Sequence, residues 1–282
     1  MNRLLPLLGL CGLALAQTVS PPPSTLGKPK FVRGNLYAIE APLNGAQGPN
    51  IAIYVTSEGV VLVDDRFDQD YEQAIARVKT VTDQPIRYVI KTHNHGNNTG
   101  AFRKMLPDVQ AITSFKSREN MVRMKMAAPP AITYSGEASL FLGGAEIRML
   151  QLGKAHTNGD TAVFFPAERA VYVGDLMAAT DRVTKPSVDY LSGGSLVEGP
   201  AVLDKILSLD IETVIPGTGF GVTDKAALLA HRNKVAAVGK RVREMVGAGK
   251  SKEEVNQMLI SEFSFKPVNL HGLDGMVEEM KQ

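Results

Sequence analysis

The heptapeptide Thr92-His93-Asn94-His95-Gly96-Asn97-Asn98 follows an apolar segment, residues 86–91, whose composition predicts a buried strand. Two histidines one residue apart at the end of a strand can direct their rings toward one point. Neutral imidazoles in that arrangement are ligands for a divalent metal ion, most often zinc. Solvated loop histidines also occur at this spacing, so His93 and His95 alone leave both interpretations open.

This heptapeptide resembles the signature of the metallo-β-lactamase superfamily, H-x-H-x-D-H, which also follows a strand. His93 and His95 match the first two positions of the signature. Asn97 stands where the family has aspartate, and Asn98 stands where it has the last histidine. Both replaced ligands belong to the second metal position of the family, so the resemblance implies an asymmetric site.

His156 lies in a second segment that is similar to this family, Gly153-Lys154-Ala155-His156-Thr157-Asn158-Gly159-Asp160. The family's third motif is a histidine in a loop that ends in Gly-Asp. Together with His93 and His95, this histidine would complete the open three-histidine site that catalytic zinc uses. The alternative is a polar loop histidine that caps a neighbouring carbonyl group.

Asp175 follows Gly174 at the end of a predicted strand and matches the aspartate that bridges two metal ions in the family. In a site with one ion, Asp175 would be either a fourth ligand or the hydrogen-bond acceptor for a metal-bound water. A closed site is structural in character, whereas an open site is catalytic. An aspartate that only caps the next segment is the third possibility.

The last family motif, P-G-H-G, is represented by Pro216-Gly217-Thr218-Gly219, in which Thr218 replaces the histidine. Thr218 is therefore the third position, after Asn97 and Asn98, at which a ligand of the second metal is replaced. Neutral amide and hydroxyl oxygens bind such cations weakly. The resemblance implies one zinc ion rather than two, with Thr218 next to the ligands and not among them.

Three further residues have expected roles around that ion. Asp64 matches a family aspartate that orients the ligands from behind, and we prefer it to its neighbour Asp65. Asn97 and Asn98 are expected to be catalytic, because an amide NH2 near a metal-bound water or an oxyanion could donate a hydrogen bond. That effect is worth about 3–4 kcal/mol in other enzymes. The alternative is that both asparagines only satisfy backbone groups of the loop.

The order of the predicted elements suits two stacked sheets. Strands are predicted at residues 36–39, 51–55, 60–63, 86–91, 109–113, 139–142, 145–152, 161–165, 170–173 and 213–215. Helices are predicted at residues 70–81, 98–105, 115–126, 196–209, 224–246 and 251–263. The resemblance spans residues 35–219 and implies an α/β fold, a four-layer αββα sandwich of two mixed β-sheets flanked by helices, with the site at one edge.

The N-terminus has the pattern of a secretory signal peptide, with Arg3, a short apolar run and Ala14-Leu15-Ala16. We expect a signal peptide over residues 1–16, a Pro-rich leader over 17–30 and one metallo-β-lactamase-like domain over 31–282. The apolar run is shorter than the roughly 20 residues that span a bilayer. An exported protein, periplasmic or secreted, with no membrane span after cleavage is therefore expected.

Two alternatives for the N-terminus are an uncleaved anchor and a lipid attached to Cys11, although Leu10 argues against the lipid. Cys11 is the sole cysteine, so the mature protein is expected to have neither a disulfide nor a thiolate ligand. The formal charge is +2 over 282 residues, which gives no electrostatic reason to expect nucleic acid as a partner. The oligomeric state is left open.

Two functions fit these motifs. The first is an exported, mononuclear zinc hydrolase that acts on a small-molecule substrate of acyl type: an ester, lactone, lactam or thioester. Zinc lowers the pKa of a bound water toward about 7. A β-lactam is not favoured, because family members that hydrolyse it normally keep part of the second site. The second function is a non-catalytic metal- or ligand-binding protein on a decayed hydrolase scaffold, for which the same three substitutions argue.

Overall fold

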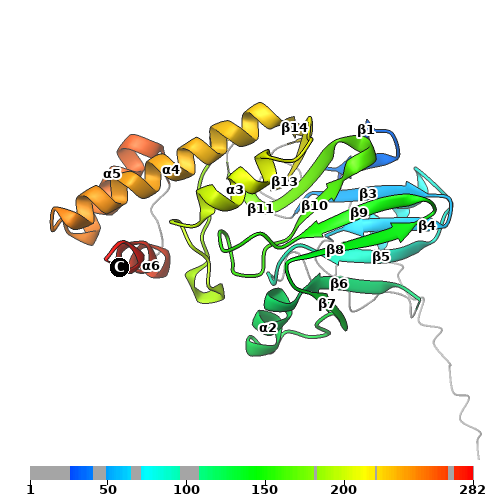
Figure 1. The fold of residues 1–282 in the computed structure, drawn as a ribbon, viewed down its shortest axis with the longest axis horizontal. Helices are drawn as coiled ribbons and strands as arrows, with labels where there is room; N and C mark the ends of the chain where they lie inside the picture. Colours follow the sequence, from blue (N-terminus) through cyan, green and yellow to red (C-terminus); the bar gives the residue numbers. More distant parts are fainter. Residues whose placement is uncertain are drawn as a thin grey trace, which may run out of the picture.

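The computed structural model describes residues 26–40, 49–64, 71–95, 108–180, 183–219, 221–265 and 270–281. Within these ranges two β-sheets pack face to face, and helices lie outside them (Figure 1). The predicted αββα sandwich of two mixed sheets is confirmed. The expected signal peptide, the helix at 98–105, and residues Asp65, Asn97 and Asn98 lie outside the described residues.

The first sheet has the strand order β1-β2-β3-β4-β5-β6-β7. Its strands are β1 (Lys30–Arg33), β2 (Leu36–Ile39), β3 (Ile51–Thr56), β4 (Gly59–Val63), β5 (Ile86–Lys91), β6 (Gln110–Ser114) and β7 (Ile132–Tyr134). Strands β1 to β4 pair antiparallel, and β4 to β7 pair parallel. Helix α1 (Tyr71–Lys79) packs its Ala74 and Val78 on one face of this sheet, and α2 (Phe115–Arg123) follows β6 directly.

The second sheet has the strand order β14-β13-β11-β10-β9-β8, and β12 pairs with β11. Its strands are β8 (Glu137–Leu142), β9 (Ala145–Leu150), β10 (Ala162–Phe165), β11 (Ala170–Thr180), β12 (Val183–Thr184), β13 (Thr213–Thr218) and β14 (Thr223–Asp224). Only the β11–β13 pair is parallel among these described strands. Two short 3-10 helices, η4 (Pro166–Glu168) and η5 (Tyr190–Ser192), lie in its connections.

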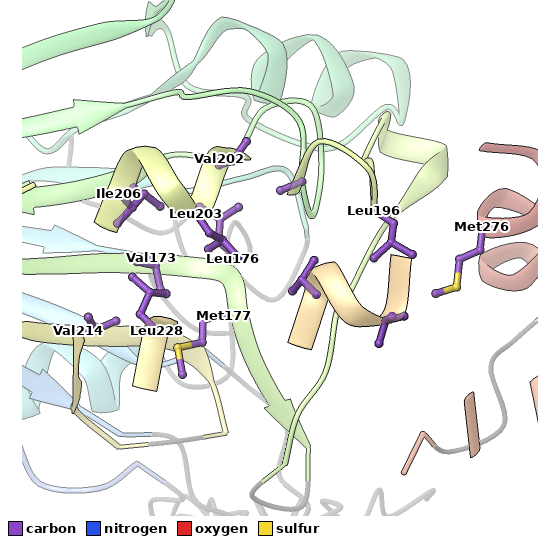
Figure 2. Packing of buried hydrophobic residues seen from close by; sticks show 14 of the residues in the cluster. Val173, Leu176, Met177, Leu196, Val202, Leu203, Ile206, Val214, Leu228 and Met276 are labelled. Atoms are coloured by element: carbon purple, nitrogen blue, oxygen red, sulfur yellow. The ribbon is translucent and has the colours of Figure 1, made fainter. Parts of the chain in front are cut away.

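Four helices accompany the second sheet. They are α3 (Gly199–Leu207), α4 (Lys225–Gly247), α5 (Lys252–Phe263) and α6 (Leu270–Met280). Apolar residues of α3 and α4 pack on β11 and β13, and the same cluster continues to α5 and α6 at the end away from the sheets (Figures 1 and 2). Among the described residues, no helix has both the length and the apolar composition needed to cross a membrane.

Alternation along the strands divides the core into layers. Tyr54 and Val61 of the first sheet lie between the sheets in one cluster with Tyr172 of the second, whereas Ile53 and Leu62 face the cluster under α1. Each fully buried aliphatic side chain contributes about 1.5–3 kcal/mol relative to exposure. This packing holds the strand ends of both sheets in fixed relative positions, and the site is built on those ends.

Several element boundaries differ from the sequence predictions. The strand predicted to end at residue 173 is wrong in length, because β11 continues to Thr180 through irregular pairing on either side of Gly174. Gly174 has φ 54°, a left-handed conformation that glycine adopts without strain, so the strand bends there and continues. The helix predicted from residue 196 begins only at Gly199, with Pro200 in its first turn. Strands β1, β7 and β14 and helix α6 were not predicted.

Candidate metal centre

Three imidazole rings converge at one point between the sheets. Nδ1 of His95 lies 3.1 Å from Nε2 of His93 and 3.0 Å from Nε2 of His156. The three ring centroids are 4.8 Å apart in each pair, and the rings are nearly perpendicular, at 81–88°. Oδ2 of Asp175 lies 3.7 Å from Nε2 of His93 and 3.8 Å from Nε2 of His156. The structure thus brings together all four residues that the sequence analysis named as metal ligands.

These residues come from both sheets. His93 and His95 follow β5 of the first sheet, whereas His156 lies in the β9–β10 connection and Asp175 in β11 of the second. Gly217 of the neighbouring strand β13 makes room for this aspartate, because a Cβ atom at residue 217 would lie 2.4 Å from Oδ1 of Asp175. The strands of the two sheets therefore place these four polar side chains together at one edge of the sandwich.

The outer ring nitrogens of His95 and His156 show which nitrogen carries hydrogen. Nδ1 of His156 lies 2.8 Å from the carbonyl oxygen of Ser187, and Nε2 of His95 lies 2.9 Å from Oδ2 of Asp189. A carbonyl or carboxylate oxygen only accepts, so both outer nitrogens donate. In the neutral ring, Nε2 of His156 and Nδ1 of His95 then face the centre as lone pairs.

His93 is oriented through a hydroxyl group. Thr92 donates its backbone N–H and its hydroxyl to the Asp64 carboxylate, at 2.9 Å and 2.7 Å. Because that hydroxyl proton goes to Asp64, Oγ1 of Thr92 accepts from Nδ1 of His93 at 3.0 Å. Nε2 of His93 is then the third inward lone pair. Asp64, with φ 58° and no exposed surface, thus contacts His93 through Thr92.

The donor set fits a divalent metal ion. The lone pair of His95 lies 3.0–3.1 Å from those of His93 and His156, so they repel one another unless a cation lies between them; tetrahedral zinc spaces its nitrogen ligands about 3.3 Å apart. Oδ1 of Asp175 is buried without a hydrogen-bond partner among the described residues. An uncompensated buried acceptor is costly, and a nearby cation would compensate it. Imidazole nitrogen with carboxylate oxygen is a ligand combination that suits zinc.

Electrostatics differ between the two neighbouring histidines. Burial lowers the pKa of His93 well below its usual value, and the charges of His156, His95 and Lys91 lower it further. Burial also opposes protonation of His95, but the hydrogen bond and charge of Asp189, together with the charges of Asp175 and Asp160, outweigh it and raise the pKa of His95. His95 therefore competes for a proton, and metal affinity is expected to fall as the pH falls.

Asp189, Ser187 and Thr92 were missed as orienting residues by the sequence analysis. Asp189 directly precedes Tyr190-Leu191-Ser192-Gly193-Gly194, whose two glycines could have signalled a close approach of this loop to another segment. In the structure a Cβ atom at Gly194 would lie 2.3 Å from the carbonyl oxygen of His156. The signal does not say which segment is approached, so it could not have assigned the role.

Polar side chains also tie α2 to the site. Asn120 donates to Oδ1 of Asn94 at 3.2 Å and to Oδ1 of Asn158 at 2.9 Å, and Asn94 donates to Oγ of Ser192 at 3.1 Å. Asn94 lies between the two histidines of the first motif, and Asn158 is two residues after His156. This network fixes the two histidine loops against each other.

The roles of the remaining predicted site residues stay predictions. Thr218 ends β13 opposite Ala178 of β11, directly after Gly217, whose backbone lies against Asp175. Asn97 and Asn98 are outside the described residues, so their catalytic role stays a prediction. A cavity of about 20 Å³ beside His156 and Asp175 has room for roughly one water molecule, given that a water needs about 10–15 Å³.

Comparisons with known proteins place this geometry in context. No family model matches the chain. The alpha subunit of 2,4-dinitroanisole O-demethylase from Nocardioides sp. (strain JS1661) is 26% identical over 138 residues, 48% of this chain and 40% of the subunit. The beta-lactamase-like protein 2 homolog of Caenorhabditis elegans is 25% identical over 224 residues, 75% of this chain and 69% of that protein. This chain therefore spans less than half the length of the demethylase subunit.

Solved structures with a similar fold cover most of the chain. A metallo-beta-lactamase from Pontibacter korlensis superposes with a TM-score of 0.65 at 17% identity, covering 75% of this chain and 99% of that one. The DIM-1 metallo-beta-lactamase superposes with a TM-score of 0.63 at 19% identity and the same coverage. At these identities, the likeness establishes the arrangement of sheets and helices and nothing finer.

Proposed function

We propose that this chain is an exported, mononuclear zinc hydrolase. It has the metallo-β-lactamase fold, and three histidines and an aspartate come together at one edge of the sandwich. The observation that carries this proposal is the inward orientation of three imidazole lone pairs, each set by an outward hydrogen bond. Such an open three-histidine set is the arrangement used by catalytic zinc.

His93, His95 and His156 would hold the ion, and Asp175 lies beside it. Zinc, when bound, supplies a water whose pKa falls toward about 7 and polarises a substrate oxygen. We assign Asp175 the role of proton acceptor, because it is the carboxylate of the converging group and its Oδ2 lies near the rings of His93 and His156. Asp160 is less suited, because its carboxylate already accepts the N–H and hydroxyl of Thr157.

The distances from Asp175 to the histidine rings favour a role as proton acceptor over a role as fourth metal ligand. Oδ2 of Asp175 lies 3.7–3.8 Å from Nε2 of His93 and Nε2 of His156, whereas Nδ1 of His95 lies 3.0–3.1 Å from the same two nitrogens. A carboxylate set back in this way would leave room for a water beside an ion held by the three histidines. A base within reach of that water contributes about 10²–10⁴-fold to the rate.

The substrate class is part of the proposal. We propose a small molecule with an acyl centre: an ester, lactone, lactam or thioester. A lactam is the least favoured member, because residues 97, 98 and 218 are asparagine, asparagine and threonine. The name of the Nocardioides relative describes removal of a methyl group from an aryl ether, so aryl ethers belong in the substrate panel.

The test is zinc stoichiometry together with turnover, measured on residues 17–282. We expect one zinc ion per chain, hydrolysis of at least one acyl substrate, and loss of both in His95→Ala. His231→Gln is the matched control, because His231 is a buried histidine outside the converging group. Absence of zinc contradicts the proposal, and two tightly held ions contradict the mononuclear part. One zinc ion without turnover on any class supports the alternative, a non-catalytic binding protein.

A further inference from the structure

The connection between β12 and α3 carries the outward partners of two site histidines. Ser187 offers its carbonyl oxygen to His156, and Asp189 offers its carboxylate to His95. We call residues 187–197 the orienting loop. Its backbone also bonds to the segment that holds His156, from Asp189 N–H to the His156 carbonyl at 2.8 Å and from Ser195 N–H to the Ala155 carbonyl at 2.9 Å.

Glu279 of helix α6 accepts four hydrogen bonds from this loop. Its donors are the hydroxyl of Tyr190 at 2.9 Å, the backbone N–H of Leu196 at 3.0 Å, the backbone N–H of Val197 at 3.3 Å and the hydroxyl of Ser195. Both carboxylate oxygens are used, and the side chain is half-buried. Bonds from neutral donors to a carboxylate are stronger than bonds between neutral groups.

Close packing reinforces this contact. A Cβ atom at Gly275 would lie 2.3 Å from the ring of Tyr190, so the ring lies directly on the backbone of α6. Leu196 of the orienting loop and Met276 of α6 belong to one apolar cluster, and both are labelled at its α6 side in Figure 2. Burial and the neighbouring carboxylate raise the pKa of Tyr190 far above its usual value, so its hydroxyl stays a donor.

We propose that Glu279 is a positioning residue for the metal centre, which holds the orienting loop so that Ser187 and Asp189 fix the rings of His156 and His95. This inference rests on the proposed metal site. It adds that a residue of the C-terminal helix α6 influences how the site histidines are oriented. Outer partners of metal-bound histidines set ring orientation, and their loss costs about 10–100-fold in metal affinity. Glu279 acts one step further away, so the lower end of that range is expected.

The experiment measures Zn²⁺ affinity of the full chain by competition with a chromogenic chelator. We expect Glu279→Ala to weaken Zn²⁺ binding about 10-fold. Glu278→Ala is the matched control, because Glu278 is the next residue of the same helix and its exposed side chain pairs with Lys281. Glu279→Gln keeps the shape and one acceptor oxygen, so it should restore part of the affinity. Equal affinity of Glu279→Ala and wild type would overturn the inference.

Two further readouts separate positioning from a general loss of stability. Amide hydrogen exchange should increase at Leu196 and Val197 in Glu279→Ala while the β5 and β11 amides keep their protection. In the background of Asp189→Ala, the effect of Glu279→Ala should shrink, because coupled residues are not additive. Uniformly faster exchange, or full additivity, would show that Glu279 only stabilises the fold.

Failure of the inference and failure of the proposed function look different. If the wild-type chain binds no Zn²⁺, the proposed metal site is wrong. If the wild type binds Zn²⁺ and Glu279→Ala binds it equally well, the metal site stands and the positioning role of Glu279 is wrong.

Discussion

Asp189 accepts a hydrogen bond from Nε2 of His95 at 2.9 Å, and this contact leaves Nδ1 of His95 facing the other two site histidines. The two residues are far apart in sequence and lie on loops of different sheets. Each partner perturbs the other: Asp189 raises the pKa of His95, and the hydrogen bonds and charge of His95, together with Ser192, lower the pKa of Asp189 despite its burial.

The first prediction concerns this pair. Asp189→Ala removes the acceptor for Nε2 of His95, so the ring is free to adopt the other tautomer or rotate. We expect Zn²⁺ affinity to fall about 10–100-fold, measured by chelator competition at constant pH. Asp204→Ala is the control, because Asp204 is an exposed aspartate paired with Arg232 away from the site. Unchanged affinity in Asp189→Ala would contradict the orienting role.

Thr92→Val tests the path from Asp64 to His93. The substitution keeps the side-chain shape but removes the hydroxyl that bonds to both residues, so the fully buried Asp64 loses one of its hydrogen-bond donors. We expect a loss of about 1–3 kcal/mol in the free energy of unfolding, together with weaker Zn²⁺ binding. Urea unfolding of the metal-free protein measures the first effect.

The matched control for that substitution is Thr113→Val in the neighbouring strand β6. Thr113 is equally buried, and its hydroxyl donates to the Lys91 carbonyl. Its replacement should destabilise the fold without changing the affinity for Zn²⁺. If both valine variants bind Zn²⁺ as the wild type does, the hydroxyl of Thr92 does not orient His93.

Asp175→Asn separates the two roles that the sequence leaves open for this residue. An asparagine keeps the shape but cannot take up a proton, so we expect turnover to fall about 10²–10⁴-fold while one Zn²⁺ per chain is retained. The measurements are kcat on the substrate found in the panel and metal content of the same sample. Loss of the ion in Asp175→Asn would instead identify Asp175 as a ligand.

His231 makes the stability of the fold depend on pH. Burial lowers its pKa from 6.5 to about 4, against a smaller opposing effect of its hydrogen bond to the Leu176 carbonyl. Between these two values the unfolded chain binds more protons than the folded one, so this contribution to stability is present above pH 6.5 and is lost as the pH falls toward 4.

The expected loss is about 2 kcal/mol between pH 7.5 and pH 5, since one pKa unit corresponds to about 1.4 kcal/mol. Urea unfolding of metal-free wild type and His231→Gln at both pH values measures it, and the variant should lack this part of the pH dependence. Parallel pH profiles for the two proteins would show that His231 does not titrate in this way.

The resemblance of the motifs to the metallo-β-lactamase superfamily was sufficient to predict which residues converge at the site. His93, His95, His156 and Asp175 come together as expected: the first two follow β5, His156 lies between β9 and β10, and Asp175 follows the bend of β11 at Gly174. Spacing could not predict Asp189 and Ser187, because their placement depends on tertiary contacts of the orienting loop with α6, far along the chain.

Helix α6 illustrates why the rest could not be predicted. Its sequence contains Gly272 and Gly275, and glycine inside a helix costs about 1 kcal/mol relative to alanine. Local preference therefore argues against a helix, and packing against η5 and α4 overrides it. Gly275 weakens the helix locally but lets the ring of Tyr190 lie against its backbone.

The site draws two donors from each sheet of the sandwich, His93 and His95 from the first and His156 and Asp175 from the second. Each half of the chain therefore supplies only two of the four donors. A bound cation would therefore link the two halves of the chain, and a shift of one sheet relative to the other would weaken its binding.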